Sequence, residues 1–240
     1  MEIQNIFERK EIKFIISKHQ KNILLSKIKS HLVKDEFGQT LIKNIYYDTS
    51  NYDLIKKSLD SPVYKEKFRI RSYGETNSQS KVFLEIKKKY KGIVYKRRMS
   101  MSENDAKLYM RNNIRKSEYN GQILNEIDYF KNFYKDLGPK MLIFYERQAF
   151  YDKEDHDLRI TFDENITYRE NDFDLRLDSY GTKILNGKIL MEIKLKDAFP
   201  LWLVKELNDL NIYKTSFSKY GEAYKNKIVN QEELLNERIV

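Results

Sequence analysis

Cations alternate with apolar residues along residues 64–99. If residues 65–73 form a strand, successive side chains point to opposite faces, which places Phe68 and Ile70 together on one face. The opposite face then carries Lys65, Lys67, Arg69 and Arg71. Two later runs repeat the pattern, residues 81–90 with Glu85, Lys87 and Lys89, and residues 93–99 with Lys96 and Arg98. Successive strands with cations on a shared face predict a site for a polyanionic molecule.

The same alternation occurs at the beginning of the chain and in three segments of its second half. Their charged or polar positions on one face are Glu11 and Lys13, then Arg147, then Arg159, Thr161 and Asp163, then Glu192, Lys194 and Lys196. On one strand, a charged face is usually a solvated face. Many strands with mixed Arg, Lys and Glu, combined with helices that can cover an outer surface, instead predict charged faces turned inward. We therefore expect a closed antiparallel barrel with a charged lumen and helices packed outside.

Helices are predicted where apolar residues recur with a period near 3.6. The predicted helices cover residues 18–33, 51–59, 106–110, 123–137 and 200–210, and a last one begins near residue 218. Ser17 and Ser102 precede two of them, and a serine hydroxyl can accept a hydrogen bond from a free amide of the first turn. These helices would position the charged strands by covering their apolar side.

The length, composition and net charge of the chain limit the class of protein to which it can belong. The 240 residues are 40% hydrophobic and contain no repeat or Gly, Pro or Ser-rich linker, so we predict one domain over residues 1–240. No apolar run approaches the ~18 residues of a membrane span, and the N-terminus lacks a signal-peptide core. No cysteine is present. We expect a soluble cytoplasmic protein, and its net charge of +9 favours an acidic partner.

Histidine chemistry is not predicted. His19 and His31 fall in or beside the first predicted helix and His156 falls in a predicted loop, which argues against a histidine metal site or a His-based triad. The sequence also lacks a P-loop, a GxGxxG motif and an HExxH motif. The charged strands are therefore the main candidates for chemistry.

Phosphoryl transfer suits such a cationic lumen, because positioning and charge neutralisation by Lys, Arg and a divalent metal can carry the reaction without a protein nucleophile. A carboxylate among the cations is the natural ligand for Mg²⁺ or Mn²⁺. Glu192, Glu85 and Glu11 lie on the charged faces and are the candidates. Each is alternatively a charge partner of its Lys and Arg neighbours.

Seven collinear segments carry a family resemblance. They read ERKEIKF, FRIRSYG, FLEIKKKYKGIVYKRR, YERQAF, LRITFDENI, MEIKLKDAFPLWL and SFSKYGEAY. This set resembles the VTC (vacuolar transporter chaperone) domain, the catalytic domain of polyphosphate polymerases in the triphosphate tunnel metalloenzyme superfamily. The resemblance covers nearly the whole chain. It implies an α+β fold with an eight-stranded antiparallel tunnel that transfers the γ-phosphate of ATP, or of another nucleoside triphosphate, to inorganic polyphosphate or pyrophosphate.

The resemblance also implies roles for individual residues and a divalent metal, Mn or Mg. The implied phosphate ligands are Lys13, Arg69, Arg71, Lys87, Lys96, Arg98, Arg147, Arg159, Lys194 and Lys219. Of these, Lys87, Arg71 and Lys219 are the predicted catalytic residues. Glu192 is the predicted metal ligand.

Two departures from the family pattern qualify the resemblance. The wider superfamily opens with an ExExK signature, whereas Arg9 occupies the first of these positions here, which removes one metal ligand and fits the VTC branch better than the hydrolytic branch. Eukaryotic members add an SPX regulatory domain and a membrane domain. Neither is recognisable in these 240 residues, so we do not expect coupling to membrane translocation.

Three functions from different classes stay open. The first is a polyphosphate polymerase, the second is a tunnel hydrolase of triphosphate or tripolyphosphate, and the third is a non-catalytic polyphosphate-binding module. Specific nucleic-acid binding is not expected, because a duplex cannot enter a barrel of about eight strands whose lumen is filled with side chains. No recognition helix with clustered base-reading residues is apparent either.

Overall fold

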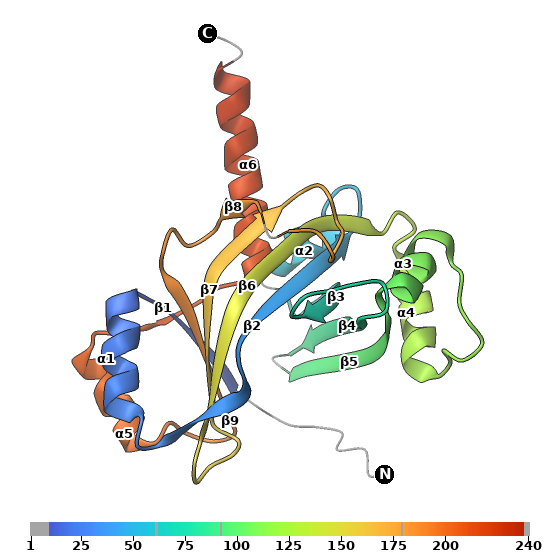
Figure 1. The fold of residues 1–240 in the computed structure, drawn as a ribbon. Helices are drawn as coiled ribbons and strands as arrows, with labels where there is room; N and C mark the ends of the chain where they lie inside the picture. Colours follow the sequence, from blue (N-terminus) through green and yellow to red (C-terminus); the bar gives the residue numbers. More distant parts are fainter. Residues whose placement is uncertain (1–9, 61, 92, 179, 238–240) are drawn as a thin grey trace. The chain divides into compact units, whose positions relative to one another are not determined.

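The computed structural model describes residues 10–60, 62–91, 93–178 and 180–237, with ten strands and six helices among them (Figure 1). The strands are β1 Lys10–Ile16, β2 Leu32–Asp48, β3 Tyr64–Tyr73, β4 Lys81–Tyr90, β5 Ile93–Ser102, β6 Gly138–Asp152, β7 Arg159–Arg169, β8 Thr182–Lys183, β9 Ile189–Leu195 and β10 Lys214–Thr215. The helices are α1 Lys18–Ile28, α2 Asp53–Leu59, α3 Glu103–Asn112, α4 Gln122–Phe133, α5 Leu201–Asp209 and α6 Lys219–Glu237. No helix among the described residues is long and apolar enough to cross a membrane.

The chain forms two compact units. Unit 1 falls within Met1–Leu41, Tyr145–Ile166 and Leu185–Ser218, and unit 2 falls within Ile42–Phe144, Thr167–Ile184 and Lys219–Val240. Strands β2, β6 and β7 contribute residues to both units. One domain over residues 1–240 stays a prediction.

The sheet confirms the α+β class and corrects the predicted barrel. Its strand order is β10-β1-β9-β7-β6-β2-β3-β4-β5, with β8 paired to β7, and the pairs β1–β9, β3–β4 and β4–β5 are antiparallel. Among the described residues no pairing joins β5 to β10, so the ten-stranded sheet is open. The prediction of a closed eight-stranded barrel is therefore wrong. The alternation of residue types in a strand shows which face each side chain occupies, but it does not show which strand lies beside it. The edge strand β5 is basic, and charged side chains on an edge strand oppose pairing with a further strand.

The hydrophobic core of unit 1 lies on one face of β1, β9 and β7. Phe14 is paired with Met191 and Ile160 with Ile193, and all four side chains are buried. Helices α1 and α5 cover this face, where Leu24 and Leu203 join the same core. The charged positions of these strands consequently lie on the other face.

The capping prediction for α1 is confirmed, since Ser17 accepts a hydrogen bond from the Gln20 amide and the Gln20 side chain accepts one from the Ser17 amide. The helix ends at Ile28 rather than at residue 33. Leu32 and Val33 instead begin β2, so their apolar spacing with the helix was coincidental.

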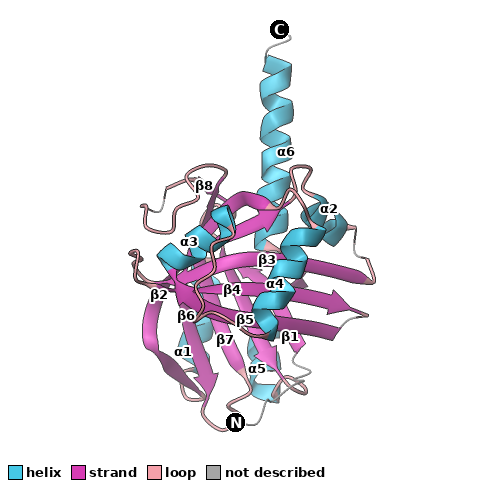
Figure 2. Cartoon of the chain, turned by 90° about the vertical axis from the view of Figure 1, so that its right-hand side faces the viewer, coloured by secondary structure: helices cyan, strands magenta, loops and turns pink. Residues whose placement is uncertain are grey.

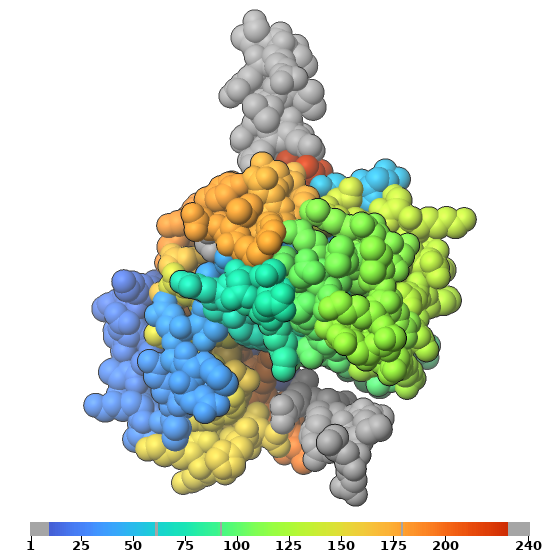
Figure 3. Space-filling view, turned by 45° about the vertical axis from the view of Figure 1, so that its right-hand side comes forward, coloured from blue at the N-terminus to red at the C-terminus, as the bar shows by residue number. Residues whose placement is uncertain are grey.

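In unit 2, β3 pairs with β2 on one side and β4 on the other. Phe68 and Ile70 are buried on the face that α3 and α4 cover (Figure 2). Ser102 caps α3 as predicted, by accepting a hydrogen bond from the Asp105 amide. Figure 3 shows the green part of the chain, which includes α3, beside the teal part, which includes the loop that joins β3 to β4. In this region the Glu103 amide donates a hydrogen bond to the Ser80 carbonyl at 2.9 Å.

Candidate functional site

The predicted cations of β3, β4 and β5 lie on one face of the sheet in unit 2. Paired residues of neighbouring strands point to the same side, so the register defines rows across the sheet. One row consists of Tyr46, Arg69, Glu85 and Arg98, and the next consists of Lys67, Lys87 and Lys96. We call these residues, together with Arg71, the cation face. It is the face opposite Phe68 and Ile70.

Glu85 is the centre of the cation face. Its side chain is only 1% exposed, and its carboxylate lies 2.7 Å from Arg69 Nη2 and 3.1 Å from Lys96 Nζ. Arg98 Nε and Arg71 Nε follow at 3.7 and 4.0 Å. Burial alone would raise the pKa of Glu85, but the charges of Arg69, Arg71 and Lys96 outweigh it and lower the pKa to about 2. One buried, ionised carboxylate therefore lies among four cations.

Two polar residues of β2, not predicted as site residues, orient these arginines. Tyr46 accepts a hydrogen bond from Arg69 Nη1 at 3.1 Å, and Asn44 accepts one from Arg71 Nε at 2.8 Å. Burial raises the pKa of the Tyr46 phenol, yet Arg69 and Arg71 together with Lys219 bring it below its ordinary value. The alternation of Asn44 and Tyr46 with Ile45 in β2 was the signal that could have revealed them.

Lys219 and Lys87 occupy different environments. Lys219 is the first residue of α6, and its positive charge is one of those that lower the pKa of Tyr46. The following residue, Tyr220, stacks on Tyr46 with ring centroids 4.7 Å apart.

Lys87 is exposed, and no ion pair reaches it within the part of the chain that the structure describes. Its charge is thus available to a ligand.

A second charged cluster lies in unit 1 around Arg147. Asp163 is fully buried and accepts two hydrogen bonds from this guanidinium, at 2.6 and 2.7 Å. Glu192 lies 3.2 Å from Arg147 Nη2 and 3.9 Å from Lys13 Nζ. Burial opposes the charge of Arg147, but Asp163 and Glu192 raise its pKa well above the ordinary value. The guanidinium therefore stays charged.

The other predicted residues of unit 1 form a looser group. Glu11 and Lys194 are paired across β1 and β9, with Lys194 Nζ 3.6 Å from the Glu11 carboxylate. Arg159 is paired with Lys194 in the register, yet its guanidinium contacts Asp35 at 3.2 Å and lies over the Tyr151 ring. The structure thus joins Lys13, Arg147 and Glu192, whereas Arg159 is directed toward Asp35.

The donor set limits how a metal could be held. Within the described residues, no group of three or more His, Asp or Glu side chains is arranged around a metal position. Asp163 is held by Arg147, while Glu192 makes longer contacts with two cations that also suit phosphate. This set suits Mg²⁺ or Mn²⁺ if the ion takes one ligand from a protein carboxylate and its other ligands from phosphate oxygens and water. Arg9 lies outside the described residues.

A comparison with protein families identifies the family of the chain. Residues 8–227 match the family model described as the VTC domain. The chain belongs to the VTC domain family. The resemblance predicted from the seven sequence segments is confirmed, while the roles of individual side chains in this VTC domain stay predictions.

The chain is also similar to solved structures at low identity, and the first of them, with a TM-score above 0.5, shares its fold. A proposed adenylate cyclase from Bacillus halodurans is 14% identical, with 89% of this chain and 94% of that chain covered and a TM-score of 0.55. A proposed adenylyl cyclase from Hippeastrum, described as having a dominant triphosphatase activity, is 16% identical over 88% of this chain and 92% of its own, with a TM-score of 0.49. No curated protein sequence is significantly similar to this chain.

Replacing Glu85 by Gln tests the electrostatic centre of the cation face. Because the folded pKa of about 2 lies below the ordinary 4.5, the charge of Glu85 stabilises the fold above pH 4.5 and loses its effect as the pH falls toward 2. This difference corresponds to roughly 3 kcal/mol at neutral pH. We expect urea unfolding to show a deficit of that order for Glu85→Gln at pH 7 that narrows by pH 3. The exposed Glu75→Gln variant is the control, and a deficit independent of pH would contradict the prediction.

Proposed function

We propose that the chain is a metal-dependent polyphosphate polymerase, which transfers the γ-phosphate of ATP to a growing inorganic polyphosphate chain. The observation that carries the proposal is the cation face, where rows of Arg and Lys surround one buried carboxylate in a member of the VTC domain family. Other nucleoside triphosphates are alternative donors, and pyrophosphate is an alternative acceptor.

Charge and geometry both support phosphate binding at this face. The four cations around Glu85 exceed its single negative charge by three, which attracts a multiply charged anion. Arg69 and Arg71 present planar forks that match phosphate oxygens, and their hydrogen bonds to Tyr46 and Asn44 fix them in advance.

The reaction proposed for this face is direct phosphoryl transfer. A terminal oxygen of the polyphosphate attacks the γ-phosphorus, the bond to the bridging oxygen breaks, and its electron pair leaves with ADP. We assign Arg71, Lys87 and Lys219 to the oxygens of the transferring group, because fixed cations offset negative charge as it moves toward the leaving group. Lys87 suits this role since it is exposed and makes no ion pair within the described residues.

In unit 1, we assign Lys13, Arg147 and Lys194 to phosphate contacts and Glu192 to a divalent metal. A bound Mn²⁺ or Mg²⁺ would supply charge neutralisation on phosphate oxygens. Arg147 is suited to phosphate because Asp163 fixes its orientation while the charge is retained. Arg159 would reach phosphate only by exchanging its contact with Asp35.

Hydrolysis of a triphosphate is the second candidate function. The same cations would neutralise the same transferring group if water replaced the polyphosphate acceptor. Membership of the VTC domain family favours the polymerase. The third candidate, a non-catalytic polyphosphate-binding module, would need the cation face but no turnover.

One assay separates the three functions. We expect incubation of the purified chain with ATP and Mn²⁺ to produce a ladder of long polyphosphate on a stained gel, together with ADP. Free phosphate without a ladder would identify a hydrolase. Binding of polyphosphate without consumption of ATP would identify a binding module.

Lys87→Ala tests the assignment of the cation face to turnover. Removing an exposed cation that contacts the transferring group is expected to lower kcat/KM by about 100-fold. Thermal unfolding should be unchanged, because no ion pair of the described residues is lost. Lys88→Ala is the matched control, since Lys88 is paired with Glu66 and Tyr95 and points to the opposite face of β4. Equal activity of the two variants would remove Lys87 from the proposed site.

Glu192→Gln tests the metal assignment in unit 1. This change preserves shape and removes one negative charge, so triphosphate affinity measured without metal should be unchanged or tighter. Turnover in excess Mn²⁺ should fall by about 100-fold or more if Glu192 holds the metal. Near-normal turnover would mean that Glu192 only balances Lys13 and Arg147, and the metal role would pass to Glu85 or Glu11.

A further inference from the structure

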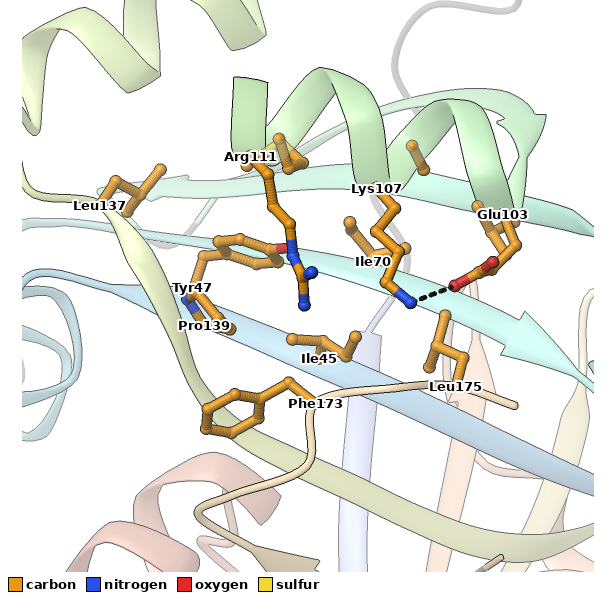
Figure 4. A pocket seen from close by; sticks show the side chains of 13 residues that line it. Ile45, Tyr47, Ile70, Glu103, Lys107, Arg111, Leu137, Pro139, Phe173 and Leu175 are labelled. Carbon is orange, nitrogen blue, oxygen red and sulfur yellow. Dashed lines mark ion pairs between the residues drawn. The ribbon is translucent and has the colours of Figure 1, made fainter. Parts of the chain in front are cut away.

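Unit 2 contains a small cavity on the side of the sheet opposite the cation face. Its volume is about 170 Å³, and α3 forms its roof (Figure 4). The floor is apolar and consists of Ile45, Ile70 and Val82 from three neighbouring strands. Phe173 and Leu175, from the segment that follows β7, line another side. An apolar body is the natural occupant of such a space.

Arg111 is the charged residue that distinguishes this cavity from a packing defect. Figure 4 shows its guanidinium directed from α3 into the cavity, toward Ile45 and Phe173. In the stretch of chain that the structure describes, Arg111 makes no hydrogen bond and no ion pair with protein. A guanidinium at an apolar cavity, with its donors available, favours an anionic group that can accept two parallel hydrogen bonds.

The other charges at the cavity already have partners. Lys107 Nζ lies 2.8 Å from the Asp174 carboxylate and 3.8 Å from that of Glu103. Glu103 is also 3.8 Å from Arg176 Nε. Burial raises the pKa of Glu103, and the charge of Arg111 is among those that oppose this rise, although Arg111 makes no ion pair among the described residues. Lys107, Arg111 and Arg176 together exceed Glu103 and Asp174 by one positive charge, so the cavity favours a ligand with a single negative charge.

The volume limits the size of the ligand. An engineered protein cavity of about 150 Å³ admits benzene. The space beneath α3 is comparable, which is enough for one ring or a short branched chain and far less than a nucleotide requires. The apolar floor selects against a bare phosphate, which would lose hydration without gaining partners there.

We propose that the cavity beneath α3 is a binding site for a small organic monoanion, a carboxylate with a compact apolar body whose carboxylate is held by Arg111 and whose body lies on Ile45, Ile70 and Val82. This site is separate from the proposed phosphate-binding residues. It does not rest on the polymerase activity, because its test is direct binding.

The test uses 4-fluorobenzoate as the probe, followed by fluorine NMR during titration of the full chain. We expect saturable binding, and binding of the neutral analogue 4-fluorobenzyl alcohol that is weaker by about tenfold or more. Arg111→Gln should weaken 4-fluorobenzoate by a similar factor and leave the alcohol unchanged. Lys18→Gln, which removes one exposed charge from α1 in unit 1, should bind the probe as the unchanged chain does.

A second variant tests the location independently of charge. Ala106 is buried in α3 and lines the cavity, so Ala106→Leu should fill the space and abolish binding while Arg111 stays in place. If this variant does not fold, the exposed Arg111→Gln variant still decides the question. Absence of saturable binding, or equal affinity of the unchanged chain and Arg111→Gln, would overturn the proposal, whatever the outcome of the polyphosphate assay.

Discussion

The cation face depends on the attraction between one buried carboxylate, Glu85, and the cations of three strands. Arginines and lysines on neighbouring strands repel one another when they share a face, and each would favour a conformation that points away from the others. Glu85 removes this problem because its carboxylate lies within 4.0 Å of Arg69, Arg71, Lys96 and Arg98. Its low pKa keeps the negative charge in place at any ordinary pH. The face is therefore ordered before a ligand arrives, and it retains a positive excess to bind one.

In unit 1, two carboxylates, Asp163 and Glu192, likewise lie beside cations, but their contacts differ. Asp163 is fully buried and holds Arg147 through two short hydrogen bonds, so its oxygens are committed to orienting that guanidinium. Glu192 contacts Arg147 and Lys13 at longer distances, 3.2 and 3.9 Å. Asp163 is thus already engaged in orienting a guanidinium, which supports the proposed assignment of the metal to Glu192 rather than to Asp163.

The sequence predicted the faces of the strands better than their neighbours. Alternation separated Phe68 and Ile70 from the cations of β3, because a strand allows only two directions for its side chains. It could not reveal β8 and β10, which have two residues each, or show that the sheet is open. The residues LIKNIYYD predict a strand over residues 41–48, but not the first part of β2, where Gly38 has a φ of +60° and interrupts the pattern. Asp35, the partner of Arg159, lies in that part, so the direction of Arg159 was not predictable.

The position of Glu85 bears on the choice between an enzyme and a simple polyphosphate binder. A surface that only binds polyphosphate would bind it more tightly with a neutral residue in place of this carboxylate, since each negative charge weakens the attraction for phosphate. Glu85 instead lowers the positive excess and fixes the arginines beside it, with Tyr46 and Asn44 adding directional hydrogen bonds. An enzyme's kcat depends on how its catalytic groups are oriented. Binding that is equally strong in the ground state and the transition state does not raise kcat. A cation face that gives up affinity for a fixed geometry therefore supports the proposed phosphoryl transfer over the alternative of a polyphosphate-binding module.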